Sequence, residues 1–226
     1  MFAKHFPVTD TFKKEKKGSL RDLRSSDREK QLKAAKYLVR RACGNWTGDA
    51  KCWLADPRTA DILLDALAVT PTAVQALIVD TLGLIVERYS YYDLRIRDCL
   101  VSMFEGSEDE VRLEIAGAIC PFRDKEVWEI VLRGFDCQPK PKTRLAERLG
   151  MIARHQKLIR SKPQRRRLYD RVLAAASSSR NIDAVSNWCM AAFSLRQEDT
   201  QKDLLTCVDP KFHELVRKWA NRNVQD

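Results

Sequence analysis

Residues 107–119 read Ser-Glu-Asp-Glu-Val-Arg-Leu-Glu-Ile-Ala-Gly-Ala-Ile, and this segment is the most informative about the fold. Val111, Ile115 and Ile119 recur at four-residue steps, which places them on one face of a helix. Ser107 supplies an N-cap, and the three acidic residues after it favour the positive end of a helix. The segment therefore predicts an amphipathic helix over residues 109–119.

The same three- and four-residue spacing of apolar residues extends over most of the chain. No segment shows the alternation of a β-strand next to a hairpin turn, so we predict an all-α chain. The expected helices span residues 27–42, 57–69, 72–88, 92–105, 109–119, 125–135, 142–156, 164–177, 182–195 and 210–222. Two of them start with Asp-Pro, at Asp56-Pro57 and Asp209-Pro210, where Asp is the expected N-cap and proline the first helical residue.

Four of the expected helices share one pattern, an aliphatic residue followed by apolar or small residues four and eight positions on. The aliphatic residues are Val74, Val111, Leu145 and Val185, at intervals of 37, 34 and 40 residues. Helices with bulkier apolar faces lie between them, and short loops favour antiparallel packing of neighbours. The spacing indicates a helix pair that repeats about every forty residues.

The 107–119 segment resembles the second helix of a HEAT-type (armadillo-like) repeat. In that helix an acidic residue comes before a Val-Arg pair, here Val111-Arg112, and the pair is followed by Ala and a small residue. The two Asp-Pro starts resemble first helices of that family. Elsewhere the Val-Arg pair becomes Val74-Gln75 or Val185-Ser186. The resemblance implies an α-solenoid of about five irregular antiparallel helix pairs, whose second helices line a concave surface that commonly binds a partner. The alternative is a non-repetitive helical bundle.

Charge divides the chain into blocks. The formal net charge is +10, with +8 in residues 1–45, −7 in 46–135, +10 in 136–180 and −1 in 181–226. Lys and Arg residues clustered on one face of the protein attract phosphates or a carboxylate-rich protein. We interpret residues 1–26 as a basic N-terminal arm that is in part disordered, residues 27–222 as one HEAT-like helical domain, and residues 223–226 as a tail.

The candidate binding residues lie in the third charge block. Arg144, Arg148 and His155 share one face of the expected 142–156 helix, and further cations surround the next turn. The full predicted partner-binding set is Lys142, Arg144, Arg148, Arg154, His155, Arg165, Arg166, Arg167 and Arg171. The alternative is a solvated helix surface balanced by acidic neighbours.

No sequence motif nominates a cofactor, a metal ion or a catalytic centre. The chain lacks a P-loop, a dinucleotide fingerprint and the His motif of zinc proteases, and its seven cysteines form no C-x-x-C pair. Dispersed thiols suit a reducing compartment, so we expect a cytoplasmic protein without cofactors. No segment has the apolar length of a membrane span, and the first thirty residues do not resemble a secretory signal.

Two functional hypotheses follow. The first is a noncatalytic helical-repeat protein that binds a protein partner, with an acidic surface favoured, through its concave, partly basic face. Adaptors, assembly chaperones and toxin-neutralising immunity proteins are the classes considered. The second is a nucleic-acid-binding protein. HEAT-type DNA glycosylases resemble the chain in size and charge, and Trp188, Asp183 and Arg148 would be the candidate parts of such an enzyme.

The character of the surface separates these hypotheses. A continuous positive stripe favours phosphate, whereas a mixed-sign surface with exposed aromatic residues favours protein. The aromatic residues expected to discriminate are Trp46, Trp53, Tyr91 and Tyr92.

Overall fold

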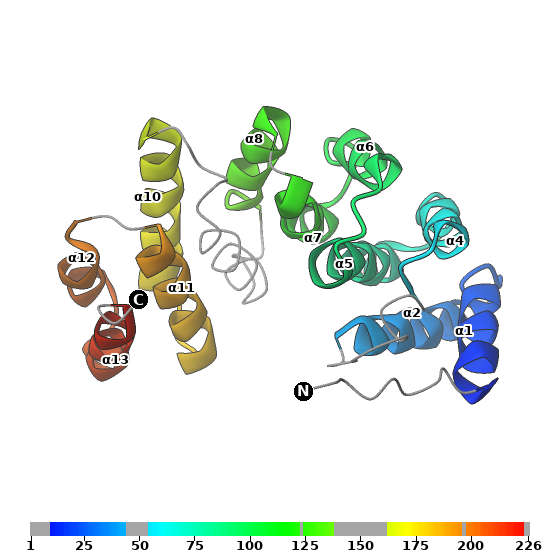
Figure 1. Ribbon diagram of the computed structural model, residues 1–226, viewed down its shortest axis with the longest axis horizontal. Coiled ribbons are helices and arrows are strands. Elements are labelled where there is room, and N and C mark those ends of the chain that lie inside the picture. The colour runs from blue at the N-terminus through cyan, green and yellow to red at the C-terminus, as the bar shows by residue number, and fades with distance from the viewer. Residues whose placement is uncertain (1–9, 44–53, 123, 138–161, 196–197, 224–226) are drawn as a thin grey trace, which may run out of the picture. The chain divides into compact units, whose positions relative to one another are not determined.

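The computed structural model describes residues 10–43, 54–122, 124–137, 162–195 and 198–223, and every regular element in these ranges is a helix (Figure 1). The prediction of an all-α chain is confirmed for these residues. The chain divides into two compact units, Met1–Phe122 and Arg123–Asp226.

Within its described residues, the first unit contains three helix pairs. They are α1 (Asp10–Asp22) with α2 (Arg28–Cys43), α4 (Pro57–Leu67) with α5 (Thr72–Tyr89), and α6 (Leu94–Met103) with α7 (Asp109–Ile119). A 3-10 turn, η1 (Cys120–Phe122), follows α7. The first helices contact one another in the order α1, α4, α6, and the second helices in the order α2, α5, α7. The first unit is therefore built of two layers, each with one helix from every pair.

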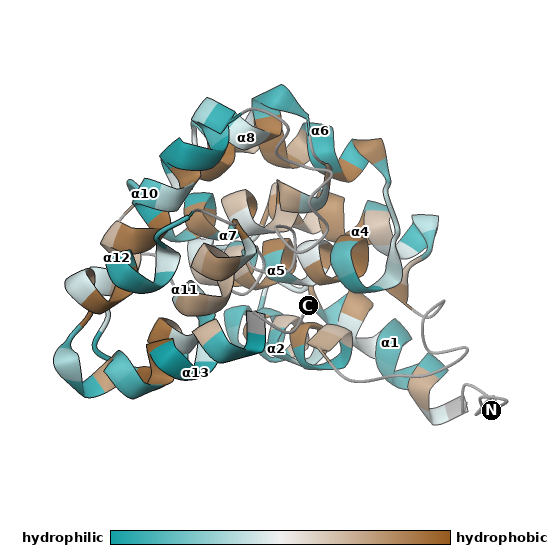
Figure 2. Ribbon diagram, turned by 60° about the vertical axis from the view of Figure 1, so that its left-hand side comes forward, coloured by the Kyte–Doolittle hydropathy of each residue, from teal (hydrophilic) through white to brown (hydrophobic). Residues whose placement is uncertain are grey.

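The core of this unit is centred on α5 and α7. Every residue of α5 from Ile78 to Val86 is buried, because α5 contacts α2, α4 and α7 at the same time. Figure 2 shows many hydrophobic residues on both helices. A helix that is apolar on most of its surface is stable only when neighbours cover it on several sides.

Helix α1 lies in the segment that the sequence predicted as a basic arm. Its apolar residues are few, but Leu20 and the following Leu23 are buried against the unit. Polar contacts add to this packing, because the Lys16 ammonium lies 2.6 Å from the Asp56 carboxylate of α4. Helix α1 therefore belongs with the helical unit and does not form an unpacked arm.

One hydrogen bond from a side chain to the backbone recurs in the three described pairs of the first unit. A long donor side chain near the start of the second helix reaches a backbone carbonyl eight residues earlier, at the end of the first helix. The bonds are Gln31 Nε2 to the Leu23 carbonyl (3.3 Å), Gln75 Nε2 to the Leu67 carbonyl (2.8 Å) and Arg112 Nε to the Phe104 carbonyl (2.9 Å). The last carbonyls of a helix have no partner within the helix, so these donors satisfy them.

The recurring hydrogen bond accounts for the change from Val-Arg in α7 to Val-Gln in α5. Gln75 and Arg112 occupy equivalent positions after Val74 and Val111, and either side chain is long enough to reach the carbonyl. In these two helix pairs the position carries a long donor, which is Gln in one and Arg in the other. Ser186, which follows Val185 in the second unit, instead accepts a hydrogen bond from Trp219 Nε1 at 3.1 Å.

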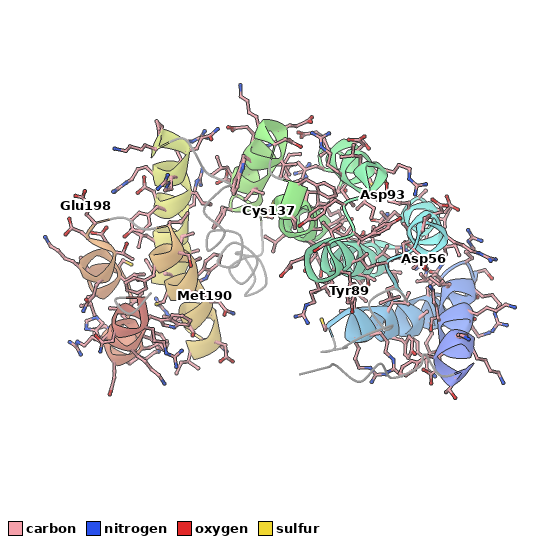
Figure 3. The ribbon with its side chains drawn as sticks, viewed as in Figure 1. Asp56, Tyr89, Asp93, Cys137, Met190 and Glu198 are labelled. Atoms are coloured by element: carbon pink, nitrogen blue, oxygen red, sulfur yellow. The ribbon has the colours of Figure 1, made fainter. Side chains whose placement is uncertain are left out.

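Of the predicted helix N-caps, the one at the start of α4 is confirmed and the one at the start of α7 is wrong. Asp56 accepts a hydrogen bond from the Thr59 amide at 3.0 Å, which confirms the predicted Asp56-Pro57 start of α4. Figure 3 labels Asp56 and Asp93 at the starts of α4 and α6. The predicted Ser107 cap is wrong. The N-cap of α7 is Glu108, and the Ser107 hydroxyl instead donates to the carbonyl of Met103, the last residue of α6, at 2.8 Å.

The second unit contains α8 (Lys125–Gly134), α10 (Lys162–Ser178), α11 (Ile182–Ser194), α12 (Thr200–Cys207) and α13 (His213–Asn223). Helix α10 pairs with α11 and α12 with α13, while α10 also contacts α12 and α11 contacts α13. Asp209-Pro210 opens the 3-10 turn η2 (Pro210–Phe212), so α13 begins three residues later than predicted. The helix expected over residues 142–156 lies outside the described residues.

Candidate binding surfaces

The predicted binding set divides between two parts of the chain. Lys142, Arg144, Arg148, Arg154 and His155 lie outside the described residues. Arg165, Arg166, Arg167 and Arg171 all lie on α10, a first helix of its pair, where Arg165 is half-buried and the other three are exposed.

The three exposed arginines of α10 each pair with a carboxylate. Arg166 Nε lies 2.9 Å from Asp170 Oδ1 on the same helix. Arg167 reaches Glu129 of α8 at 3.4 Å, and both terminal nitrogens of Arg171 donate to Asp136, just after α8. The arginine side chains remain 47% to 60% exposed. Exposed pairs of this kind contribute about 0–1 kcal/mol, so α10 presents a mixed-sign surface that can exchange partners at low cost.

A second charged surface lies between α1 and α2, where the sequence predicted no binding residues. A groove of about 730 Å³ opens between these helices. It is lined by Ser19, Arg21, Asp22, Arg24, Ser25, Lys30, Lys33, Ala34 and Tyr37. Residues 10–43 contain twelve Lys and Arg against five Asp and Glu, a net charge of +7. We call this surface the α1–α2 groove.

Three of the four cations in the α1–α2 groove have carboxylate neighbours. Arg21 lies 3.2 Å from Asp22, Arg24 lies 3.0 Å from Asp65 of α4, and the Lys30 ammonium lies 3.7 Å from Asp27. Lys33 is exposed and has no carboxylate partner among the residues that the structure describes. The rim of the groove is therefore positive and open to solvent.

The side chains beneath the groove form a fixed network. The Tyr37 hydroxyl donates to Glu15 at 2.5 Å, while Arg41 donates to the Tyr37 hydroxyl and to Glu15, each at 2.9 Å. The bond from Tyr37, with the charge of Arg41, outweighs desolvation and lowers the pKa of Glu15, whereas burial and Glu15 raise the pKa of Tyr37. The carboxylate stays charged and the phenol stays neutral near neutral pH.

The guanidinium of Arg41 also lies over two aromatic rings. Its central carbon is 4.5 Å from the centre of the Phe12 ring and 5.0 Å from that of Tyr37, over which Arg40 also lies at 5.9 Å. These contacts fix α1 against α2. In the sequence, Phe12 and Glu15 stand out because they interrupt a lysine-rich segment. Their contacts with Tyr37 and Arg41 become evident only when α1 packs against α2.

Exposed apolar residues gather at the start of α6. Tyr92 is 50% exposed, and Leu94 is 65% exposed. The Tyr92 ring meets the Phe122 ring edge-on, with 6.1 Å between centroids. Tyr91 is half-buried, and its hydroxyl donates to Asp93 at 3.2 Å. Trp46 and Trp53, the other two aromatic residues expected to be informative, lie outside the described residues.

The residues considered for a DNA glycosylase do not form a site in the described part of the chain. Trp188 is fully buried, and its ring centroid lies 5.8 Å from that of Phe135. Asp183 is exposed in the first turn of α11, and Arg148 lies outside the described ranges. A tryptophan in the core is not available to stack on a base.

The described residues offer little other chemistry. Within those ranges, no group of three or more His, Cys, Asp or Glu side chains is placed to hold a metal ion. Burial raises the pKa of the Cys189 thiol to about 12, which keeps it protonated. None of the described helices has the length and apolar character needed to cross a membrane.

Comparison with known proteins adds information on the fold. The sequence matches no family model and no curated protein. Among solved structures, it is similar to a crystal structure described as an engineered protein, with a TM-score of 0.58 and 17% sequence identity. The likeness covers 96% of this chain and 97% of the other. At this identity the likeness concerns the fold alone.

Proposed function

We propose that this protein is a noncatalytic α-solenoid of helix pairs that binds a protein partner. The observation that carries the proposal is the ordered contact of equivalent helices: α1, α4 and α6 in one layer of the first unit, and α2, α5 and α7 in the other. Pairs that contact only their neighbours can extend into a long surface, which is suited to large interfaces at little ordering cost.

The recurring side-chain-to-carbonyl bond supports the repeat character of the pairs. Gln31, Gln75 and Arg112 each bridge the same eight-residue separation, and a non-repetitive bundle has no reason to repeat this register. The pairs of the second unit, α10–α11 and α12–α13, follow the same order of contacts between first and second helices.

The described surface favours a protein partner over a nucleic acid. The exposed arginines of α10 alternate with carboxylates, and Tyr92 and Leu94 present exposed apolar area. Aromatic residues and Arg are the common anchors of protein interfaces. Within this class, an adaptor, a chaperone and an immunity protein that covers a toxin remain the functions proposed for the chain.

The α1–α2 groove is the observation that favours the nucleic-acid alternative. Its net positive charge would neutralise phosphates, and such binding weakens steeply as salt rises. The burial of Trp188 argues against the glycosylase form of this alternative.

The test is capture of partners by the immobilised full chain from native lysate, with and without nuclease, followed by size-exclusion chromatography of the reconstituted complex. We expect a defined protein that survives nuclease treatment and co-elutes with the chain. Capture that disappears after nuclease treatment, together with salt-sensitive binding to random duplex DNA or RNA at physiological ionic strength, would contradict the proposal.

A further inference from the structure

We infer that the α1–α2 groove is the docking site for an extended segment of the partner that is rich in Asp and Glu. This inference rests on the proposed protein-binding function and names the surface and the chemistry of the partner. The groove is lined by four cations, Arg21 of α1, Arg24 of the turn that follows, and Lys30 and Lys33 of α2.

The size of the groove matches a short peptide segment. The groove is lined by the last turn of α1 and the turn after it, from Ser19 to Ser25, and by α2 from Lys30 to Tyr37. This stretch of α2 rises about 11 Å, and an extended chain advances about 3.3 Å per residue, so about three residues of a bound segment span it. Alternate side chains of such a segment point to the same side and can reach the cations of both helices.

The carboxylates already present show which ligand chemistry these cations accept. Arg21 is paired with Asp22 and Arg24 with Asp65, both through guanidinium–carboxylate contacts at the surface. Each of these exposed pairs contributes only about 0–1 kcal/mol, so incoming carboxylates can replace them at low cost. Lys33, which has no carboxylate partner among the described residues, is free to take a further one.

A single-stranded nucleic acid fits the groove less well. Binding of single strands depends on aromatic rings on which successive bases stack. Tyr37 is the aromatic residue that lines the groove, and Arg40 and Arg41 lie over its ring. Its hydroxyl is also committed to Glu15. The groove therefore offers charge without a free stacking surface.

The experiment measures binding of a fluorescein-labelled peptide of six glutamates with Gly-Ser ends, and of an oligothymidine of matching length, by fluorescence anisotropy at low and physiological ionic strength. The groove variant is Arg21→Glu, Lys30→Glu and Lys33→Glu together. The control variant, Lys202→Glu, Arg217→Glu and Lys218→Glu, makes the same charge change at exposed residues of α12 and α13. The single change Lys33→Gln tests the groove with little risk to folding.

We expect the wild-type chain to bind the glutamate peptide more tightly than the oligothymidine. The groove variant should lose at least about tenfold in affinity, which corresponds to about 1.4 kcal/mol, and the control less than about threefold. Lys33→Gln should weaken binding measurably. No binding of the peptide, equal losses in both triple variants, no effect of Lys33→Gln, or tighter binding of the oligothymidine would each overturn the inference. If the peptide fails to bind while a protein is still captured from lysate, the docking site is wrong and the proposed function stands.

Discussion

Gln31 is buried at the start of α2, and its amide nitrogen donates two hydrogen bonds. Only 6% of the residue is exposed, and Nε2 donates to the Leu23 and Ser25 carbonyls at 3.3 and 2.8 Å. Replacement by Leu would fill a similar volume but leave these acceptors without a partner. Unsatisfied buried acceptors are costly, so this residue stabilises the turn between α1 and α2.

We predict that Gln31→Leu lowers the free energy of unfolding by about 1–3 kcal/mol. Urea denaturation followed by circular dichroism provides the measurement. The control is Gln201→Leu on α12, where the glutamine is exposed and the expected change is within about 0.5 kcal/mol. Equal stability of the two variants would show that the bond is not needed.

Asp56 links two helices and gives stability a pH dependence. Burial raises its pKa, but the bonds from Lys16 and Thr59 outweigh burial, so the pKa lies below its ordinary value of 3.8. A lowered folded pKa means that the charged form is favoured by folding. The stabilisation is complete above the unfolded pKa and is lost as pH falls through the folded pKa.

We predict that Asp56→Asn destabilises the chain by about 1 kcal/mol at neutral pH and has a smaller effect below about pH 4. Asn retains the N-cap, so the change reports mainly on the charge that faces Lys16. Urea midpoints across pH provide the measurement, with Asp199→Asn as the control because Asp199 makes no side-chain cap bond. A difference that grows toward acid would contradict the account.

At the scale of elements, Trp188 organises the second unit. It is fully buried in α11 and contacts Phe135, which follows α8. Removing a buried tryptophan leaves a cavity and typically costs about 3–5 kcal/mol. We predict this loss for Trp188→Ala in thermal or urea unfolding, and within about 0.5 kcal/mol for Ile182→Ala, which is 58% exposed. A mild effect at Trp188 would mean that it does not lie in a core.

The sequence predicted most of the described helices, including the polar helices α2, α10 and α13. The expected spans over residues 72–88 and 109–119 correspond to α5 and α7, because the interior of a packed unit imposes a strong apolar period. Helices α1 and α12 were not predicted. Helix α1 is anchored largely by ion pairs and cation–π contacts, and α12 has only eight residues. Such contacts come from distant segments and leave little local pattern.

The candidate site was less predictable than the fold. The basic residues of α10 belong to the predicted binding set, and the partners Glu129 and Asp136 precede Arg167 and Arg171 by 38 and 35 residues. Pairing at that separation depends on how helices pack. The α1–α2 groove was missed for the same reason, since its cations were assigned to an arm and gain their arrangement only when α1 packs on α2.

The proposed solenoid concerns the whole molecule, because it requires helix pairs to stack in succession. A compact globule of 226 residues has a radius of gyration of about 17 Å. A stack in which each pair contacts only its neighbours is longer than a globule of the same mass. Its distribution of interatomic distances therefore has a long tail.

Small-angle X-ray scattering of the monomeric full chain tests the proposed stacking of helix pairs. For the proposed stack we expect a radius of gyration clearly above about 17 Å and an asymmetric pair-distance distribution with an extended tail. A radius near that value with a symmetric, bell-shaped distribution would contradict the stacked arrangement.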